Sequence, residues 1–119
     1  MAIETVKGEE YTVEYNEGTQ SVSFIGTIRL QTAEEYEPIL QMLYKAHDAA
    51  EPNEMICLDF RQLRFLNSSG INTISRFVIA ARKQDKIGLT VLGNRDIYWQ
   101  QKSLSNLQRL WSKVHIKIQ

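Results

Sequence analysis

The chain has 119 residues, of which 43% are hydrophobic and 24% charged, and it contains one cysteine. This length suffices for one domain with a buried core, and a single cysteine excludes an internal disulfide framework. No apolar run is long enough to span a bilayer, and the first residues lack the regions of a signal peptide, so we expect a soluble, cytoplasmic protein.

The formal net charge of zero hides two halves of opposite sign. Residues 1–59 contain 3 basic and 12 acidic side chains, whereas residues 60–119 contain 11 basic and 2 acidic ones. Such a distribution can steer association with a charged partner or with a second copy, so a homodimer is one option. The basic residues are dispersed among apolar ones, which argues against nucleic acid as the partner.

The N-terminal part of the chain predicts a hairpin. We expect residues 1–10 to form a flexible segment and residues 11–119 to form a single domain. Tyr11–Tyr15 and Ser21–Leu30 alternate large and polar side chains, as half-buried strands do. Gly26 interrupts the second of these strands and predicts a bulge or a bend.

A helix should follow the hairpin. Thr32 and Glu35 have the spacing of a capping box. Pro38 allows two interpretations, because proline deep in a helix removes an N–H donor: either the helix kinks near Glu37, or it begins at Pro38. Apolar residues then fall on one helical face, namely Ile39, Leu40, Leu43, Ala46, His47 and Ala50.

The middle of the chain combines a strand, a polar turn and a second helix. Met55–Phe60 is nearly continuous in apolar residues, which predicts a central strand buried on both faces. The turn is Asn67–Gly70, and the helix should run from about Gly70 to Lys83. A strip with two basic residues lies on its outer side, formed by Asn72, Arg76, Ile79 and Lys83.

The last third of the chain predicts strands at Leu89–Leu92 and Val114–Ile118. Between them, Asp96 can cap a helix from Ile97 to about Leu104, which Asn106 would stop. The resulting order is β-β-α-β-α-β-α-β. It predicts an α/β fold with a single mixed sheet, in which an N-terminal hairpin precedes parallel βα units, covered by three to four helices.

Three segments together resemble the STAS domain family, named after sulphate transporters and anti-sigma-factor antagonists. They are the Leu58-Asp59-Phe60 strand, the Asn67-Ser68-Ser69-Gly70 turn and the Ser105-Asn106-Leu107 end of the third helix. The resemblance spans residues 11–118 and implies a STAS-like fold. It also implies an anti-sigma-factor antagonist that binds a serine kinase acting as anti-sigma factor. In such antagonists the kinase phosphorylates the serine at the position of Ser68, and a serine phosphatase removes the phosphate.

The sequence departs from this family at Asn67, where an aspartate is usual, and in the polar segment Tyr98–Ser103. Two interpretations of the turn therefore stay open. One is a switch controlled by phosphorylation of Ser68. The other is a constitutive scaffold or transporter-associated module that binds its partner without modification.

The candidate contact residues are the four turn residues, whose glycine would let a partner backbone come close, and the strip that follows. They are Asn67, Ser68, Ser69, Gly70, Asn72, Arg76, Ile79 and Lys83. The plainer alternatives are that the serines only cap the helix and that the strip is a solvated face. A small hydrolase with Ser68 as nucleophile is a third hypothesis, but no base can be named for it. We expect no enzyme activity, no cofactor and no metal site.

Overall fold

Within residues 3–119, six strands form one mixed sheet, and their order across the sheet follows their order in the chain. The computed structural model describes residues 3–119. The strands are β1 (Ile3–Lys7), β2 (Tyr11–Asn16), β3 (Ser21–Ile28), β4 (Met55–Leu66), β5 (Gly88–Gly93) and β6 (Val114–Ile118). The first three pair antiparallel to one another, and every later pair is parallel.

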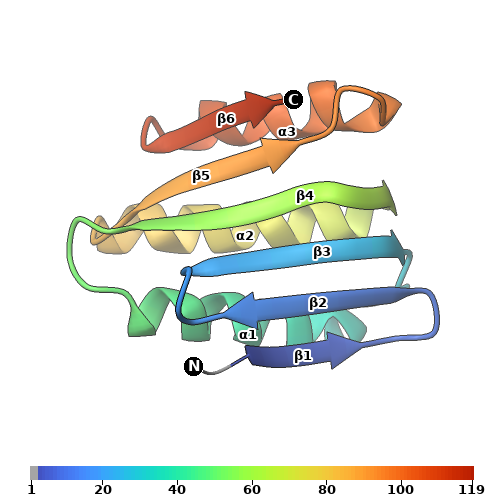
Figure 1. Ribbon diagram of the computed structural model, residues 1–119, viewed down its shortest axis with the longest axis horizontal. Helices are drawn as coiled ribbons and strands as arrows, with labels where there is room; N and C mark the ends of the chain where they lie inside the picture. The colour runs from blue at the N-terminus through green and yellow to red at the C-terminus, as the bar shows by residue number, and fades with distance from the viewer. Residues whose placement is uncertain (1–2) are drawn as a thin grey trace.

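Three helices lie behind this sheet in Figure 1, so the molecule has two layers. They are α1 (Ala33–Ala49), α2 (Ser68–Gln84) and α3 (Tyr98–Leu110). All three cover the same face because each helix connects two neighbouring parallel strands with the same hand. Each helix begins beyond the carboxyl end of a strand, which brings the three helix starts to one edge of the molecule (Figure 1). The predicted α/β class, with its hairpin and parallel units, is confirmed.

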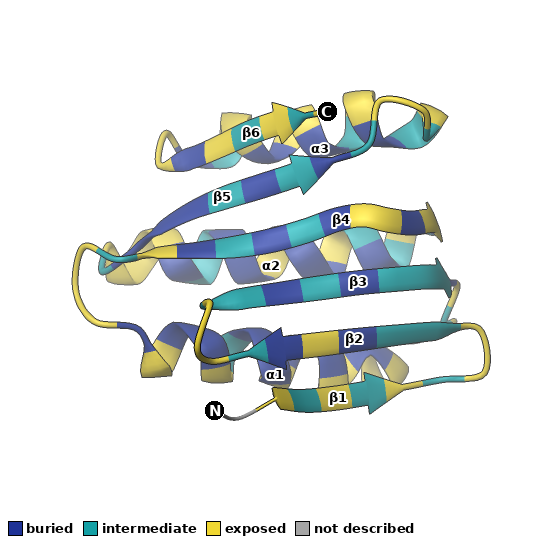
Figure 2. Cartoon of the chain, in the orientation of Figure 1, coloured by how far each residue is buried: buried dark blue, intermediate teal, exposed yellow. Residues whose placement is uncertain are grey.

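The hydrophobic core lies between the sheet and the helices. Along β4, Ile56, Leu58 and Phe60 are at most 1% exposed and face the helices. Cys57 and Asp59 alternate with them on the helix-free face and are only half-buried, as the colour bands of Figure 2 show. β4 is therefore central, as predicted, but the expectation that both of its faces are buried is wrong. Helices cover one face only.

A bulge or a bend was predicted at Gly26. This residue has a φ of +98°, and the register between β3 and β4 shifts before Ile25 and after Gly26. At both shifts the extra residue belongs to β4, so the bulges lie in the strand beside Gly26 and not at the glycine itself. A Cβ atom at this position would lie 2.3 Å from the carbonyl oxygen of Glu10. Glycine is needed here both for the backbone conformation and for the close approach.

The start of α1 is set by the predicted capping box. The Thr32 hydroxyl accepts a hydrogen bond from the Glu35 N–H at 3.1 Å, and the Glu35 carboxylate accepts one from the Thr32 N–H. The helix accordingly begins at Ala33, and the alternative start at Pro38 is wrong. Pro38 lies in the second turn on an exposed position, where its ring displaces no core side chain.

Two further expectations are corrected. Ile3–Lys7 was expected within a flexible segment, but it pairs with β2 as strand β1; residues 1 and 2 of that segment lie outside the described residues. α3 was expected to be capped by Asp96 and to stop near Asn106. Its N-cap is Ile97, which makes no side-chain capping bond, and the helix continues to Leu110 because Leu104 and Leu107 keep burying the same face.

Candidate functional site

The Asn67–Gly70 turn connects β4 to α2 and is built around the first of these residues. Asn67 is the N-cap, with an extended backbone (φ −78°, ψ 176°). Its Oδ1 accepts a hydrogen bond from the Gly70 N–H at 2.9 Å, and its carbonyl accepts one from the Ile71 N–H at 3.0 Å. Ser68 and Ser69 are thus the first two helical residues, and the expectation that they cap the helix is wrong.

The amide of Asn67 also ties the turn to the rest of the fold. Its Nδ2 donates to the carbonyl oxygen of Leu30 at 2.8 Å, and its Oδ1 accepts a second bond from the Tyr36 hydroxyl. The two backbone partners, one donor and one acceptor, fix which way the amide points. Aspartate has no donor for the Leu30 carbonyl. The departure from the family pattern at Asn67 therefore has a structural reason.

Tyr36 holds the turn through a hydrogen bond from its hydroxyl to Asn67. Its side chain comes from α1 and is 2% exposed, and burial raises the pKa of its phenol above the ordinary value. The hydroxyl therefore stays protonated and continues to donate to Asn67 throughout the physiological pH range. This contact fixes the start of α2 relative to α1.

Gly70 has an internal role rather than the predicted one. It is buried, and a Cβ atom there would lie 2.2 Å from Leu66 Cδ1 and 2.8 Å from the Tyr36 hydroxyl. The glycine lets α2 start directly against its own core. The idea that it lets a partner backbone approach is corrected, because the protein's own side chains occupy that space.

The two serines differ in exposure. Ser68 is exposed, whereas Ser69 is half-buried beside α1, where it lines a small hollow of about 160 Å³ with Ala33, Thr73 and Arg76. The first turn of α2 contains no acidic side chain. Of its N–H groups, only that of Gly70 donates to a side chain, namely Asn67. The positive end of the helix dipole, with its free N–H groups, is therefore uncompensated next to the Ser68 hydroxyl.

The predicted strip follows Ser68 along the outer side of α2. Asn72, Arg76 and Lys83 are exposed, and Ile79 is half-buried. Within the described chain, neither Arg76 nor Lys83 takes part in an ion pair. At helical spacing these four residues share one face with Ser68. The structure thus assembles an exposed hydroxyl, two unpaired cations and one apolar side chain on a single surface.

Sequence reasoning missed how α3 holds the end of β4. Beyond Asp59, β4 no longer pairs with β5, and side chains from the first turn of α3 bind its carbonyl groups instead. The fully buried Gln100 donates through Nε2 to Phe60 at 2.6 Å and Leu63 at 2.8 Å, and Trp99 Nε1 donates to Arg64 at 2.8 Å. The unusually polar segment Tyr98–Ser103 was the available signal.

Two exposed apolar side chains lie near this junction and were also missed. Phe65, two residues before the turn, is 43% exposed, and Tyr98 is 97% exposed. Single exposed apolar side chains are common on protein surfaces, so neither residue by itself marks a contact. The signal in the sequence was only the position of Phe65 next to the motif.

Chemistry for catalysis is not assembled around Ser68. In the hydrogen-bond network of residues 3–119, no histidine or carboxylate binds its hydroxyl. The same part of the chain contains no group of three or more His, Cys, Asp or Glu side chains that could hold a metal ion. It also contains no helix that is long and apolar enough to cross a membrane. The hydrolase hypothesis has no base to support it.

Comparison with solved structures places the fold. SiaC of Pseudomonas aeruginosa superimposes with a TM-score of 0.73 at 14% identity, over 100% of this chain and 99% of that chain. An anti-sigma factor antagonist from Mycobacterium paratuberculosis matches with a TM-score of 0.53 at 17% identity, over 96% of this chain and 86% of the other. The chain has a STAS-like fold.

A further match comes from a complex. A chain of the crystal structure of the diguanylate cyclase SiaD with its activator SiaC, also from Pseudomonas aeruginosa, has a TM-score of 0.72 at 13% identity, over 98% and 99% of the two chains. No protein-family model and no curated protein matches the sequence. At identities this low, the superpositions establish the STAS-like fold only. The function has to be argued from the site.

Proposed function

We propose that the protein is a regulatory binding protein, not an enzyme, and that it docks on a partner protein through Ser68 and the outer side of α2. The support is geometric: Ser68, Asn72, Arg76, Ile79 and Lys83 share one accessible face, and its two cations have no partner within the described chain. Of the proteins with a similar fold, SiaC forms a complex with the diguanylate cyclase SiaD as its activator, and the mycobacterial protein is an anti-sigma factor antagonist. An acidic surface with an apolar centre is the complementary partner.

Within this proposal, phosphorylation of Ser68 is the off signal, placed by a serine kinase that is itself the partner and removed by a serine phosphatase. The observation that carries it is the exposure of Ser68 at a helix start without acidic residues. A phosphate there adds close to two negative charges, which the free N–H groups can accept without rearrangement. The same charge would repel an acidic partner.

The constitutive module is the second candidate, and one observation favours it. Asn67 serves the fold through both of its amide atoms, and it brings no charge that a kinase would recognise beside the acceptor hydroxyl. Both candidates use the same surface. They differ only in whether Ser68 changes its chemistry.

Mass spectrometry of the protein recovered from its own cells separates these two candidates. For the switch, we expect a phosphatase-sensitive phosphate on the peptide that contains Ser68. The phosphate should be absent from the Ser68→Ala variant and present in the Ser69→Ala variant, which is the matched control because Ser69 lies in the hollow beside α1. An unmodified peptide under every growth condition would leave the constitutive module.

The docking surface is tested with a photo-cross-linking amino acid at Asn72 and, as a control, at Gln108 on the exposed side of α3. A protein captured from the protein's own cells only by the Asn72 probe is then purified and titrated. We expect Arg76→Glu to weaken its binding tenfold or more, because the charge reversal faces an acidic surface, while Lys102→Glu on α3 has little effect. Equal binding by both charge variants would refute the assignment of the surface.

A further inference from the structure

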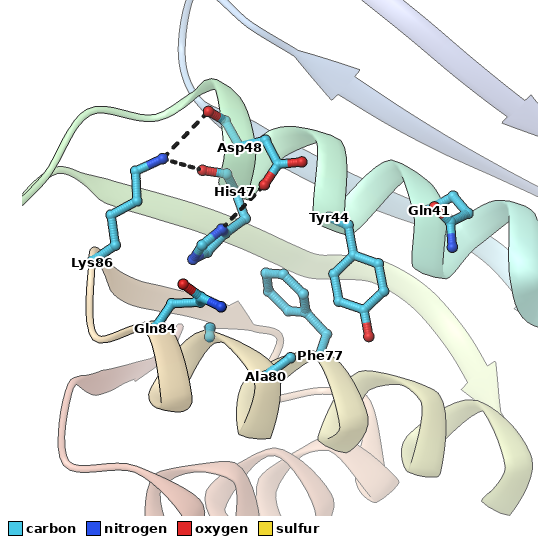
Figure 3. A pocket seen from close by; sticks show the side chains of 9 residues that line it. Gln41, Tyr44, His47, Asp48, Phe77, Ala80, Gln84 and Lys86 are labelled. Carbon is cyan, nitrogen blue, oxygen red and sulfur yellow. Dashed lines mark hydrogen bonds and ion pairs between the residues drawn. The ribbon is translucent and has the colours of Figure 1, made fainter.

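A pocket of about 480 Å³ lies between the C-terminal halves of α1 and α2. Tyr44 and Phe77 approach it from the two helices, and Figure 3 shows their rings side by side. The ring centroids lie 6.1 Å apart with a tilt of 51°. The pocket is lined by Gln41, Tyr44, His47, Asp48, Phe77, Ala80, Ala81, Gln84 and Lys86.

His47, at one end of this pocket, is a buried polar side chain without a complete set of partners. The residue is 8% exposed, and its Nε2 has no hydrogen-bond partner. Its Nδ1 lies 3.7 Å from the Asp48 carboxylate, and its ring packs edge-on against Phe77. Buried ring nitrogens are almost always paired, so an orphan beside a cavity indicates a missing partner.

The rest of the lining is suited to an amphipathic guest. Tyr44, Phe77 and Ala80 provide apolar walls, and no hydrogen bond holds the exposed amide of Gln84 within the described chain. In Figure 3 the Nε2 side of the His47 ring points toward the end of the pocket where Gln84 lies. Nε2 itself has almost no accessible surface, so a guest reaches it only by displacing this exposed amide.

Lys86 gives this end of the pocket a fixed boundary. Its Nζ donates to the carbonyl oxygens of His47 at 3.2 Å and Asp48 at 3.3 Å, the last turn of α1. The His47 carbonyl also accepts from the Ala50 N–H at the end of the helix, so the Lys86 bonds reinforce this cap and join α1 to the connection after α2. The shape of the pocket is thus set by the fold before anything binds.

The pocket continues the docking surface of α2. Ala80 and Gln84 line it and directly follow Ile79 and Lys83 of the strip, while the small hollow beside Ser69 lies at the other end of the same α1–α2 seam. A protein that covers the strip would therefore reach the pocket. Interfaces of this kind commonly gain most of their binding energy from one aromatic side chain inserted into such a pocket.

We propose that the pocket receives a hydroxyl-bearing aromatic side chain from an acidic partner protein that docks on α2. The ring packs between Tyr44, Phe77 and Ala80, and the hydroxyl pairs with His47 Nε2. The choice of an acidic partner follows from Arg76 and Lys83, which have no counter-charge in the described chain. The identity of the docked partner rests on the proposed function, but the chemistry of the pocket does not.

The chemistry is tested on the isolated protein with two probes of equal size, p-cresol and p-xylene, by two-dimensional NMR titration. We expect p-cresol to shift the resonances of Tyr44, Phe77 and Gln84 and to bind more tightly than p-xylene. The preference for p-cresol should vanish in His47→Phe, which keeps a ring but has no nitrogen. Equal binding of the two probes, or shifts elsewhere on the molecule, would overturn the proposal.

A matched pair of variants tests the location. Ala80→Leu fills the pocket, whereas Ser75→Leu adds the same side chain to a half-buried position of α2 outside it. We expect Ala80→Leu to abolish p-cresol binding and Ser75→Leu to preserve it. Thermal unfolding of each variant verifies that the fold is intact, and p-cresol binding retained by a folded Ala80→Leu would contradict the pocket assignment.

The docked partner is tested with the protein captured through Asn72. Its affinity should fall tenfold or more for Ala80→Leu and stay unchanged for Ser75→Leu. Equal affinities would show that a partner docks on α2 without using the pocket, which refutes this inference and leaves the proposed function standing. Failure to capture any protein, with p-cresol binding intact, would refute the proposed function and the partner, and leave a pocket for small molecules.

Discussion

The starts of α1 and α2 solve the same physical problem in different ways. Both helices begin at the carboxyl end of a strand, and both have a polar cap whose side chain accepts the N–H of the third helical residue. α1 adds Glu34 and Glu35 to its first turn, which compensate the helix dipole locally. α2 has no acidic residue there, and its cap also reaches Leu30 and Tyr36 in other elements.

Because of this difference, the start of α1 contributes to stability only, whereas the start of α2 can also respond to a new negative charge. The start of α1 is closed, because Glu34 and Glu35 compensate its dipole and Glu35 also accepts the N–H groups of Gln31 and Thr32. The start of α2 is held in place by the hydrogen bonds of Asn67, but no acidic side chain compensates the helix dipole near Ser68. A position with a rigid backbone and an uncompensated field can accept a new negative charge without losing its shape.

Removing the donor of Asn67 should have the largest effect. Asn67→Asp keeps the cap but replaces the bond to the Leu30 carbonyl by repulsion, so we expect a loss of about 2 kcal/mol in the free energy of unfolding. Urea unfolding at pH 7 measures it. Asn72→Asp is the matched control, since it adds the same charge to an exposed position of the same helix and should change stability little.

The sign of the pH dependence makes this prediction sharper. At position 67, the Gly70 N–H, the Tyr36 hydroxyl and the positive helix end would lower the pKa of an aspartate, whereas burial and the Leu30 carbonyl would raise it. We expect the two raising effects to be larger, so that the folded-state pKa lies above the unfolded value of about 3.9. An acid with a raised pKa destabilises the fold above that pKa and ceases to do so below its unfolded pKa. The deficit of Asn67→Asp relative to the natural protein should therefore shrink as the pH falls toward about 4, and a constant deficit would contradict the hydrogen-bond account.

Breaking the cap of α1 should have a smaller effect. Thr32→Ala removes both side-chain bonds of the Thr32 hydroxyl, and we expect a loss of about 1 kcal/mol because Glu35 continues to accept from the backbone. Thermal unfolding at matched concentration gives the value. A loss larger than that of Asn67→Asp would mean that the two starts do not differ in the way described.

Closing the start of α2 should have the smallest effect, with the opposite sign. Ser68→Asp places a carboxylate at the uncompensated helix end, so we expect a gain of about 0.3–1 kcal/mol at low salt that decreases as salt is added. Adding an acidic residue to α1 instead, by Ala33→Asp, should gain less because Glu34 and Glu35 already occupy that turn. Equal gains at the two helices would remove the electrostatic distinction between them.

Most of the fold was predictable because its elements are locally specified. The alternating strands, the capping box of Thr32 and the irregular backbone at Gly26 all depend on the local sequence. β1 was not predictable, because its two apolar residues, Ile3 and Val6, point to opposite faces. Apolar and polar residues therefore do not alternate regularly in this segment. The length of α3 was misjudged because burial of Leu107 outweighs the local preference of Asn106 to end a helix.

The candidate site was predictable in position but not in construction. The exposure of Ser68 and of the strip follows from helical spacing, and the structure places them accordingly. The bond from Asn67 to Leu30 joins residues 37 positions apart, and the anchoring of β4 by Gln100 joins residues about as distant, so no local pattern announces either. The role of Asn67, doubtful from sequence, became clear only from its partners.

The contacts that anchor β4 to α3 can form only late in the synthesis of the chain. A chain emerging from the ribosome already contains Leu30, in the connection after β3, and Tyr36 of α1 when Asn67 itself is made. Gln100 and Trp99 appear about 35 residues after the β4 carbonyls that they bind. Until then the carbonyls of Phe60, Leu63 and Arg64 lack the donors that they have in the finished fold. A partner or kinase that requires the finished turn would therefore ignore nascent chains and act on the completed protein.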